Sequence, residues 1–131
     1  MRILVVEDDF VSRRLLQAIL SPYGTCEIAV NGREAIDAFS LAWDEKAPYD
    51  LICLDIMMPD IDGHEVLQKI RTIEEKRGIC GKAGAKIIMT TALSDPRIIM
   101  KAFKEQCEAY LVKPIEKQKL LDTIGELGLL D

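Results

Sequence analysis

Several polar side chains follow short apolar runs of the sequence, at the points where β-strands are expected to end. They are Glu7, Asp8, Asp9, Asp55, Thr90, Thr91 and Lys113, and they follow the apolar runs at 3–6, 51–54, 87–89 and 110–112. If these strands are parallel neighbours, their carboxyl ends meet at one edge of a sheet, where such sheets bind ligands. The sequence therefore predicts that carboxylates, a hydroxyl group and an ammonium group converge there.

The carboxylates of Glu7, Asp8 and Asp55 would repel one another at such an edge. They stay ionised at neutral pH only if a cation compensates them or one of them takes up a proton. Hard oxygen donors with few protein ligands suit Mg²⁺, which readily shares its coordination shell with a phosphate oxygen. A carboxylate can also attack phosphorus to give an aspartyl-phosphate, with Lys113 and Thr91 placed to neutralise or bind the phosphoryl oxygens. The pattern thus points to Mg²⁺-dependent phosphoryl chemistry.

Short runs rich in Val and Ile alternate with longer segments of helical period, which is typical of βαβ units around a parallel sheet. The expected strands are 2–7, 25–30, 49–55, 86–91 and 109–112. The first, third and fourth are almost continuously apolar, as strands covered on both faces must be. We expect an α/β, doubly wound, five-stranded parallel sheet with five helices. Two strand orders fit this pattern; we favour 2-1-3-4-5, because it makes strands 1 and 3 neighbours.

The helices have clear start signals in the sequence. Asn31, Asp62 and the Ser94-Asp95-Pro96 segment are the expected starts of the second, third and fourth helices, and the fifth is expected over 116–127. The residues expected to face the core on the first helix are Val11, Leu15, Leu16, Ile19 and Leu20. The glycine-rich stretch 78–84 predicts a loop.

Length and composition indicate one domain of ordinary globular type. The chain has 131 residues, is 49% hydrophobic and 30% charged, and carries a formal net charge of -5, which argues against direct binding to nucleic acid. No segment reaches membrane-spanning length, and residues 3–6 are too short for a secretory signal. Cys26, Cys53, Cys80 and Cys107 form no Cys-x-x-Cys pair, so reduced thiols in the cytoplasm are expected.

Four segments together resemble the receiver domain of bacterial two-component response regulators, the family of the chemotaxis receiver. The segments that carry the resemblance are 3–8, 54–63, 91–92 and 110–114. The resemblance covers essentially the whole chain, so it implies a single receiver domain at 1–131 with a flavodoxin-like fold. It also implies that Asp55 accepts a phosphoryl group from a histidine of a partner protein.

The resemblance assigns roles to the other residues of the site. Glu7 and Asp8 match the acidic pair, with Asp8 as a direct Mg²⁺ ligand and Glu7 acting through water, while Met57 supplies its backbone carbonyl. Asp9 lies one position past this pair and is interpreted as a helix-start residue.

Thr91 matches the switch hydroxyl and Lys113 the phosphate-binding lysine. Tyr110 matches the aromatic residue that turns inward on phosphorylation. The Lys113-Pro114 peptide bond is expected to be cis.

The implied function is that of a cytoplasmic signalling domain rather than an enzyme acting on a separate substrate. Its phosphodonor would be a histidine kinase or a histidine phosphotransfer protein, and its output a protein-binding surface on the last two helices and strand 5. We expect a stand-alone receiver, acting as a diffusible switch or a phosphorelay intermediate on an unknown downstream target. The resemblance is also compatible with a phosphorylation-dependent homodimer.

Other functions on the same fold agree less well with the residues. A dehalogenase-like phosphatase needs a second acid two residues after the nucleophile, where Met57 stands, and a flavin site needs a phosphate-binding loop where residues 7–10 are acidic. A receiver-like module that is not phosphorylated would usually lack one of the acids, the threonine or the lysine. We interpret His64 as a surface residue. Because Met57 and Leu93 cannot orient an attacking water, we expect slow self-hydrolysis of the phosphoryl group.

Overall fold

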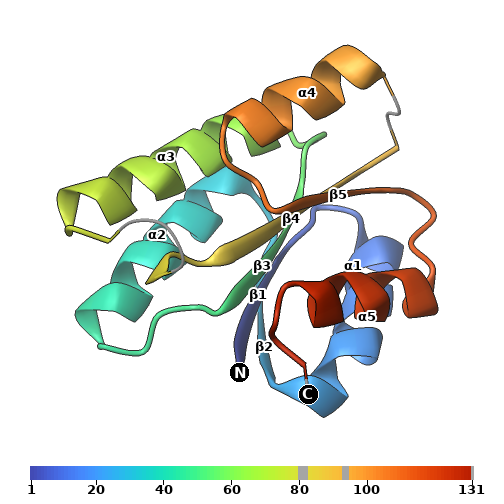
Figure 1. Ribbon diagram of the computed structural model, residues 1–131, viewed down its shortest axis with the longest axis horizontal. Helices are drawn as coiled ribbons and strands as arrows, with labels where there is room; N and C mark the ends of the chain where they lie inside the picture. The colour runs from blue at the N-terminus through green and yellow to red at the C-terminus, as the bar shows by residue number, and fades with distance from the viewer. Residues whose placement is uncertain (80–82, 93–94, 131) are drawn as a thin grey trace.

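The computed structural model describes residues 1–79, 83–92 and 95–130, which form one parallel sheet with helices on both faces (Figure 1). The strands are β1 (Arg2–Val6), β2 (Thr25–Ala29), β3 (Leu51–Asp55), β4 (Lys86–Thr91) and β5 (Ala109–Val112). The helices are α1 (Phe10–Leu20), α2 (Gly32–Asp44), α3 (Gly63–Lys76), α4 (Pro96–Lys104) and α5 (Lys117–Glu126), with a 3-10 turn, η1 (Ser21–Tyr23), after α1. The order of elements is the predicted alternation of strand and helix.

The sheet has the strand order β2-β1-β3-β4-β5, and all four pairings are parallel. The flavodoxin-like α/β fold and the order 2-1-3-4-5 predicted from the sequence are therefore confirmed. The register aligns Val6 with Leu54 and Asp55 with Thr90. The carboxyl ends of β1, β3 and β4 thus lie side by side at one edge.

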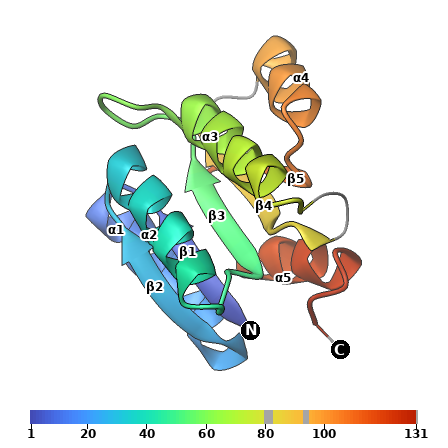
Figure 2. The same ribbon diagram turned by 90° about the vertical axis from the view of Figure 1, so that its left-hand side faces the viewer.

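Two apolar layers cover the sheet. Leu16, Ile19 and Leu20 of α1 pack with Leu120 and Ile124 of α5 on one face of the sheet. The other face is covered by α2, α3 and α4, whose buried side chains form the second cluster. Figure 2 shows α2 and α3 in front of the sheet and α1 behind it. Because successive residues of a strand point to opposite faces, each strand serves both layers.

Side-chain caps set where the helices begin. Asn31 accepts a hydrogen bond from the Glu34 backbone N–H at 2.9 Å, and Asp62 accepts one from the Glu65 N–H at 3.0 Å. Asp9 caps α1 by accepting from the Ser12 N–H at 2.9 Å, so its interpretation as a helix-start residue is correct. Asp95 caps α4, while Ser94, the other half of the expected start signal, lies outside the described residues.

One prediction about α1 is wrong. Val11 and Leu15 were expected in the core, but 73% of Val11 and 43% of Leu15 is exposed, next to Phe10 at 62%. Only the second half of the helix contacts the sheet closely, through Leu16, Ile19 and Leu20. The first half therefore presents an apolar surface, which we call the α1 patch (Phe10, Val11 and Leu15).

Arg71 joins α3 to the strands and the loop beside it. Its guanidinium donates to Glu74 at 2.7 Å, to the Ala85 carbonyl at 2.9 Å and to Glu108 at 2.7 Å. Glu74 is buried and accepts from the Ala85 N–H at 2.7 Å. These charge-assisted bonds hold the chain immediately after the glycine-rich stretch, of which 80–82 lie outside the described residues.

Cys26, Cys53 and Cys107 are free thiols, Cys80 lies outside the described residues, and burial raises the pKa of Cys53 and Cys107 to about 12. Across the described part of the chain, none of the helices has the length and apolar character needed to cross a bilayer.

Gln106, just after α4, has a backbone φ of 75°, in the left-handed region that favours glycine. Replacing it by glycine removes the Cβ clash, while its carbonyl still accepts from Arg71 at 2.8 Å. We predict that Gln106→Gly raises the free energy of unfolding by about 0.5–1 kcal/mol, measured by urea denaturation. Gln106→Ala is the matched control and should give no gain; a loss of stability in the glycine variant would contradict the strain at this position.

Candidate functional site

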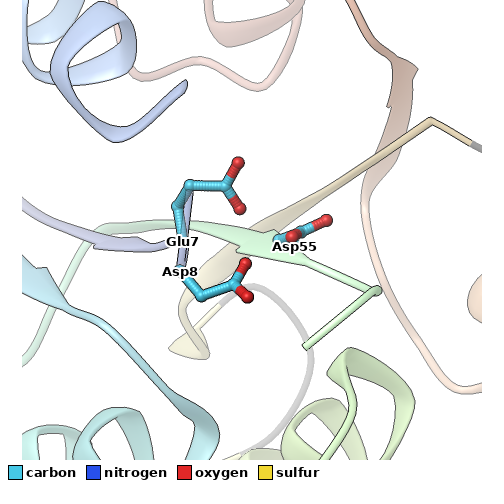
Figure 3. A group of neighbouring side chains, drawn as sticks. All are labelled: Glu7, Asp8 and Asp55. Atoms are coloured by element: carbon cyan, nitrogen blue, oxygen red, sulfur yellow. The ribbon is translucent and has the colours of Figure 1, made fainter. Parts of the chain in front are cut away.

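The carboxyl ends of β1 and β3 bring three carboxylates together. Glu7 and Asp8 follow β1 directly, and Asp55 is the last residue of β3. Each offers an oxygen atom, and these oxygens lie within 4.8 Å of one another. In Figure 3 the three side chains extend from neighbouring strand ends toward a common space. The structure thus confirms that the predicted convergence of Glu7, Asp8 and Asp55 exists.

These carboxylates differ in their surroundings. Glu7 is fully buried and Asp55 is 2% exposed, whereas Asp8 lies on the surface. Among the described residues, the Oε2 atom of Glu7 has no hydrogen-bond partner. A buried carboxylate oxygen left without a partner is costly, so the site favours a positively charged or hydrogen-bonding ligand.

Lys113 reaches this cluster from the segment that follows β5. Its Nζ atom donates a short hydrogen bond to Glu7 Oε1 and lies 3.6 Å from Asp55 Oδ2. The Lys113-Pro114 bond is cis, as expected. On the other side, Asp55 Oδ1 accepts from the Met57 N–H at 3.3 Å. The ammonium group of Lys113 therefore interacts with two buried carboxylates, those of Glu7 and Asp55, and the cluster keeps an excess of negative charge.

The electrostatics of Asp55 follow from this arrangement. Burial, then the hydrogen bond that a protonated Asp55 donates to Glu7 and the negative charge of Glu7, raise the pKa of Asp55 to about 7, while Lys113 and the Met57 N–H oppose the rise. For Lys113, burial lowers the pKa most strongly, but the hydrogen bond with Glu7 and the charge of Asp55 outweigh it, so its pKa lies above the ordinary value. The Asp55 carboxyl group thus gains or loses its proton near neutral pH.

The donor set at this edge agrees with a hard divalent cation. Three carboxylates supply only oxygen atoms, and the Glu7 oxygen that lacks a partner among the described residues is part of the cluster. Mg²⁺ prefers such oxygen donors and needs only one or two carboxylates together with water and phosphate. The residues present therefore fit an acidic pocket for Mg²⁺.

Thr91 and Tyr110 come together on the other face of the sheet from Asp55. Thr91 ends β4, is fully buried, and lies two positions after Met89 of the α2–α4 layer. Tyr110 packs partly buried against the same layer. Burial raises the pKa of Tyr110, and a side-chain hydrogen bond with Thr91 opposes that rise. The two residues predicted to act together are therefore in contact.

The prediction for His64 is wrong. It was interpreted as a surface residue, but it is 7% exposed, and its Nδ1 lies 3.0 Å from Glu105 Oε2. The two residues are 41 positions apart, so no local pattern could have paired them. Thr90, to which the sequence assigned no role of its own, has a buried hydroxyl with no partner among the described residues.

The family model described as "Response regulator receiver domain" matches residues 3–125, so the chain belongs to the family of response regulator receiver domains. Its function is that of a phosphoacceptor in two-component signalling, which makes it a signalling domain.

Curated relatives agree with this assignment. The chain is 32% identical over 127 residues to the chemotaxis protein CheY of Halobacterium salinarum, covering 96% of this chain and 95% of that protein. It is 35% identical to the probable transcriptional regulator ycf29 of Porphyra purpurea, covering 95% of this chain but 55% of that protein. It spans only 12% of the probable histidine kinase 2 of Oryza sativa. Several relatives are thus much longer than this chain.

Solved structures show the same fold. CheY4 of Vibrio cholerae has a TM-score of 0.78 at 27% identity, over 96% of this chain and 97% of that one. The receiver domain in a complex of the Saccharomyces cerevisiae proteins Ypd1 and Ssk1 has a TM-score of 0.83 at 28% identity, over 98% and 88%. Ypd1 is described as a histidine phosphotransfer signalling protein, and Ssk1 as its downstream response regulator.

The raised pKa of Asp55 has a consequence for stability. In the folded protein the pKa of Asp55 is about 7, which is above the ordinary value of an aspartate. The protonated Asp55 side chain therefore contributes stability that is fully present below about pH 4 and is lost as the pH rises through 7. In EDTA, we predict that Asp55→Asn is more stable than wild type at pH 8 by on the order of 2 kcal/mol, with a smaller difference at pH 5. Urea unfolding of both proteins at both pH values measures this. A difference that shrinks toward pH 8 would contradict it.

Proposed function

We propose that Asp55 accepts the phosphoryl group from a phosphohistidine of a histidine kinase or a histidine phosphotransfer protein. The observation that carries this proposal is the convergence of Glu7, Asp8 and Asp55, whose oxygens lie within 4.8 Å, with Lys113 reaching Glu7 and Asp55. The relationship to a receiver solved with a histidine phosphotransfer protein supports the choice of donor.

In the transfer, an ionised Asp55 oxygen attacks phosphorus and forms the new O–P bond. The P–N bond to the donor imidazole breaks, and its electron pair stays on the imidazole nitrogen. Lys113, 3.6 Å from Asp55, neutralises charge on the phosphoryl oxygens, and the Met57 N–H, which now binds Asp55, is placed to donate to them.

Glu7, Asp8, Asp55 and the Met57 carbonyl would hold Mg²⁺, with Asp8 as a direct ligand and Glu7 acting through water. Bound Mg²⁺ supplies the positive charge that keeps the clustered carboxylates ionised and balances the phosphoryl oxygens. Met57 is 58% exposed at this edge and offers no acid or amide, which supports slow self-hydrolysis. Leu93, the second residue of that prediction, lies outside the described residues.

Phosphorylation would act on the rest of the domain through Thr91 and Tyr110, which already share a hydrogen bond. If Thr91 turns toward the phosphoryl group, Tyr110 can move into the space it leaves, and the surface of α4, β5 and α5 changes. Met100 and Phe103 of α4 and Val112 of β5 are exposed apolar residues on these elements, at 69%, 44% and 37%. A downstream protein, or a second copy of this chain, would bind there. We place this switch in the cytoplasm, without direct contact to nucleic acid.

The α1 patch supplies a docking surface for the phosphodonor. It lies on the helix that begins directly after the acidic segment, and Arg13 and Arg14 lie 5.5 and 5.9 Å from the centre of the Phe10 ring. A helical donor protein would pack its apolar face on Val11 and Leu15 while its histidine approaches Asp55. The patch is therefore part of the proposed transfer complex.

The proposed acceptor can be tested with Mg²⁺ and acetyl phosphate, followed by intact mass. We predict the added mass of one phosphoryl group on wild type and none on Asp55→Asn, because the amide cannot attack. Lys113→Ala should slow the reaction by about 10²-fold. Asp60→Asn is the matched control in the same loop and should react like wild type; an added phosphoryl mass on Asp55→Asn would move the acceptor elsewhere.

The docking surface can be tested by separating protein donors from small ones. We predict that Leu15→Asp slows transfer from a histidine phosphotransfer protein that phosphorylates wild type by about tenfold, because apolar contact is lost. Its reaction with acetyl phosphate should stay within about twofold, since the reacting groups are intact. Leu41→Asp, at a position 57% exposed on α2, is the matched control. Equal slowing with both kinds of donor would argue for damage to the site instead.

A further inference from the structure

His64 and Gln68 of α3 bind both oxygens of one carboxylate at the end of α4. His64 Nδ1 lies 3.0 Å from Glu105 Oε2, and Gln68 Nε2 donates to Glu105 Oε1 at 3.1 Å. Glu105 is the C-cap residue of α4. Because an ionised carboxylate only accepts, Nδ1 of the imidazole must carry the hydrogen. The side chains of His64 and Glu105 are 8% and 12% exposed, so water competes little with this contact.

The α3 side of this contact is fixed to the strand that carries Asp55. The Gly63 N–H donates to the Ile56 carbonyl at 3.0 Å, and a Cβ on Gly63 would lie 2.5 Å from the Asp55 carbonyl oxygen. Val66 and Leu67, in the next turn, are fully buried. The first turn of α3 can therefore shift little relative to the acceptor site.

The α4 side is held far less firmly by apolar packing. Within α4, all of whose residues are described, Ala102 alone is buried. Met100 and Phe103 are exposed, and Ile98 is only partly buried. The hydrogen bonds to Glu105, together with those that Arg71 donates to the Gln106 carbonyl at 3.0 and 2.8 Å, thus make up a large share of what holds the end of α4 against α3.

We propose that His64 and Gln68 act as positioning residues that hold α4 against α3 in the arrangement seen here, and that moving α4 in the switch requires breaking their contact with Glu105. This inference rests on the proposed switch, because it concerns the helix whose surface changes on phosphorylation. The contact of His64 and Gln68 with Glu105 sets the energetic cost of moving α4. Neither residue touches the reacting atoms, so both act only through the position of α4.

The test follows amide hydrogen exchange of α4 and a titration with beryllofluoride in the presence of Mg²⁺. We expect His64→Phe, which fills the same space without the donor, to speed exchange in α4 by about tenfold and leave β3 unchanged. The beryllofluoride concentration for half-maximal response should fall by about fivefold, because less of the binding free energy is needed to release α4 from α3.

Three further variants separate the outcomes. Glu105→Gln keeps an acceptor oxygen without the charge and should speed α4 exchange less than Glu105→Ala. Lys101→Ala, which removes only the longer ion pair at 4.0 Å, should leave α4 exchange close to the wild-type rate. Glu105→Ala combined with His64→Phe should add little to either single change. Unchanged α4 exchange, or an unchanged or higher half-maximal concentration, in His64→Phe would overturn the proposal. Phosphorylation of each variant by acetyl phosphate is measured in parallel, so that failure at Asp55 is distinguished from failure of this contact.

Discussion

Mutual repulsion between buried carboxylates is the constraint on which this domain depends. Glu7 and Asp55 both lie out of water, and one ammonium group, that of Lys113, reaches both of them. Such a cluster is unfavourable unless protons, cations or a phosphoryl group rearrange its charge. The proposed binding of Mg²⁺ and transfer of a phosphoryl group to Asp55 would both change the charge balance at this edge of the sheet.

The structure separates a rigid part of the molecule from a weakly anchored one. The central strands β1, β3 and β4 are almost completely buried, and α3 is tied to them by Val66, Leu67 and the network around Arg71. In contrast, α4 depends on Ala102 and on polar contacts at its end. In the proposed switch, α4 is therefore the helix that would move in response to a change at Asp55, while the scaffold that positions the site stays in place.

Much of the fold and of the site could be predicted because the signals are local. The alternation of apolar runs and helical segments gave strand positions to within two residues, and the caps at Asn31 and Asp62 form the hydrogen bonds expected of them. The strand expected from residue 49 begins at Leu51, and Asp50 just before it donates its backbone N–H to the Arg2 carbonyl at 2.8 Å. The convergence of Glu7, Asp8 and Asp55 followed from topology alone. What could not be predicted depends on contacts between distant residues: the exposure of Val11 and Leu15, and the pairing of His64 with Glu105.

The alternation of side chains along β4 has a further consequence for how this domain can evolve. Thr90 lies on the same face as Asp55, whereas Thr91, one position later, faces the layer that contains Tyr110. An insertion or deletion of a single residue in this strand would exchange the two hydroxyl groups between the layers. The hydroxyl at position 91 would then lie on the α1 and α5 side, away from the layer against which Tyr110 packs. The contact between Thr91 and Tyr110 therefore depends on the number of residues between Lys86 and Thr91 as well as on their identities.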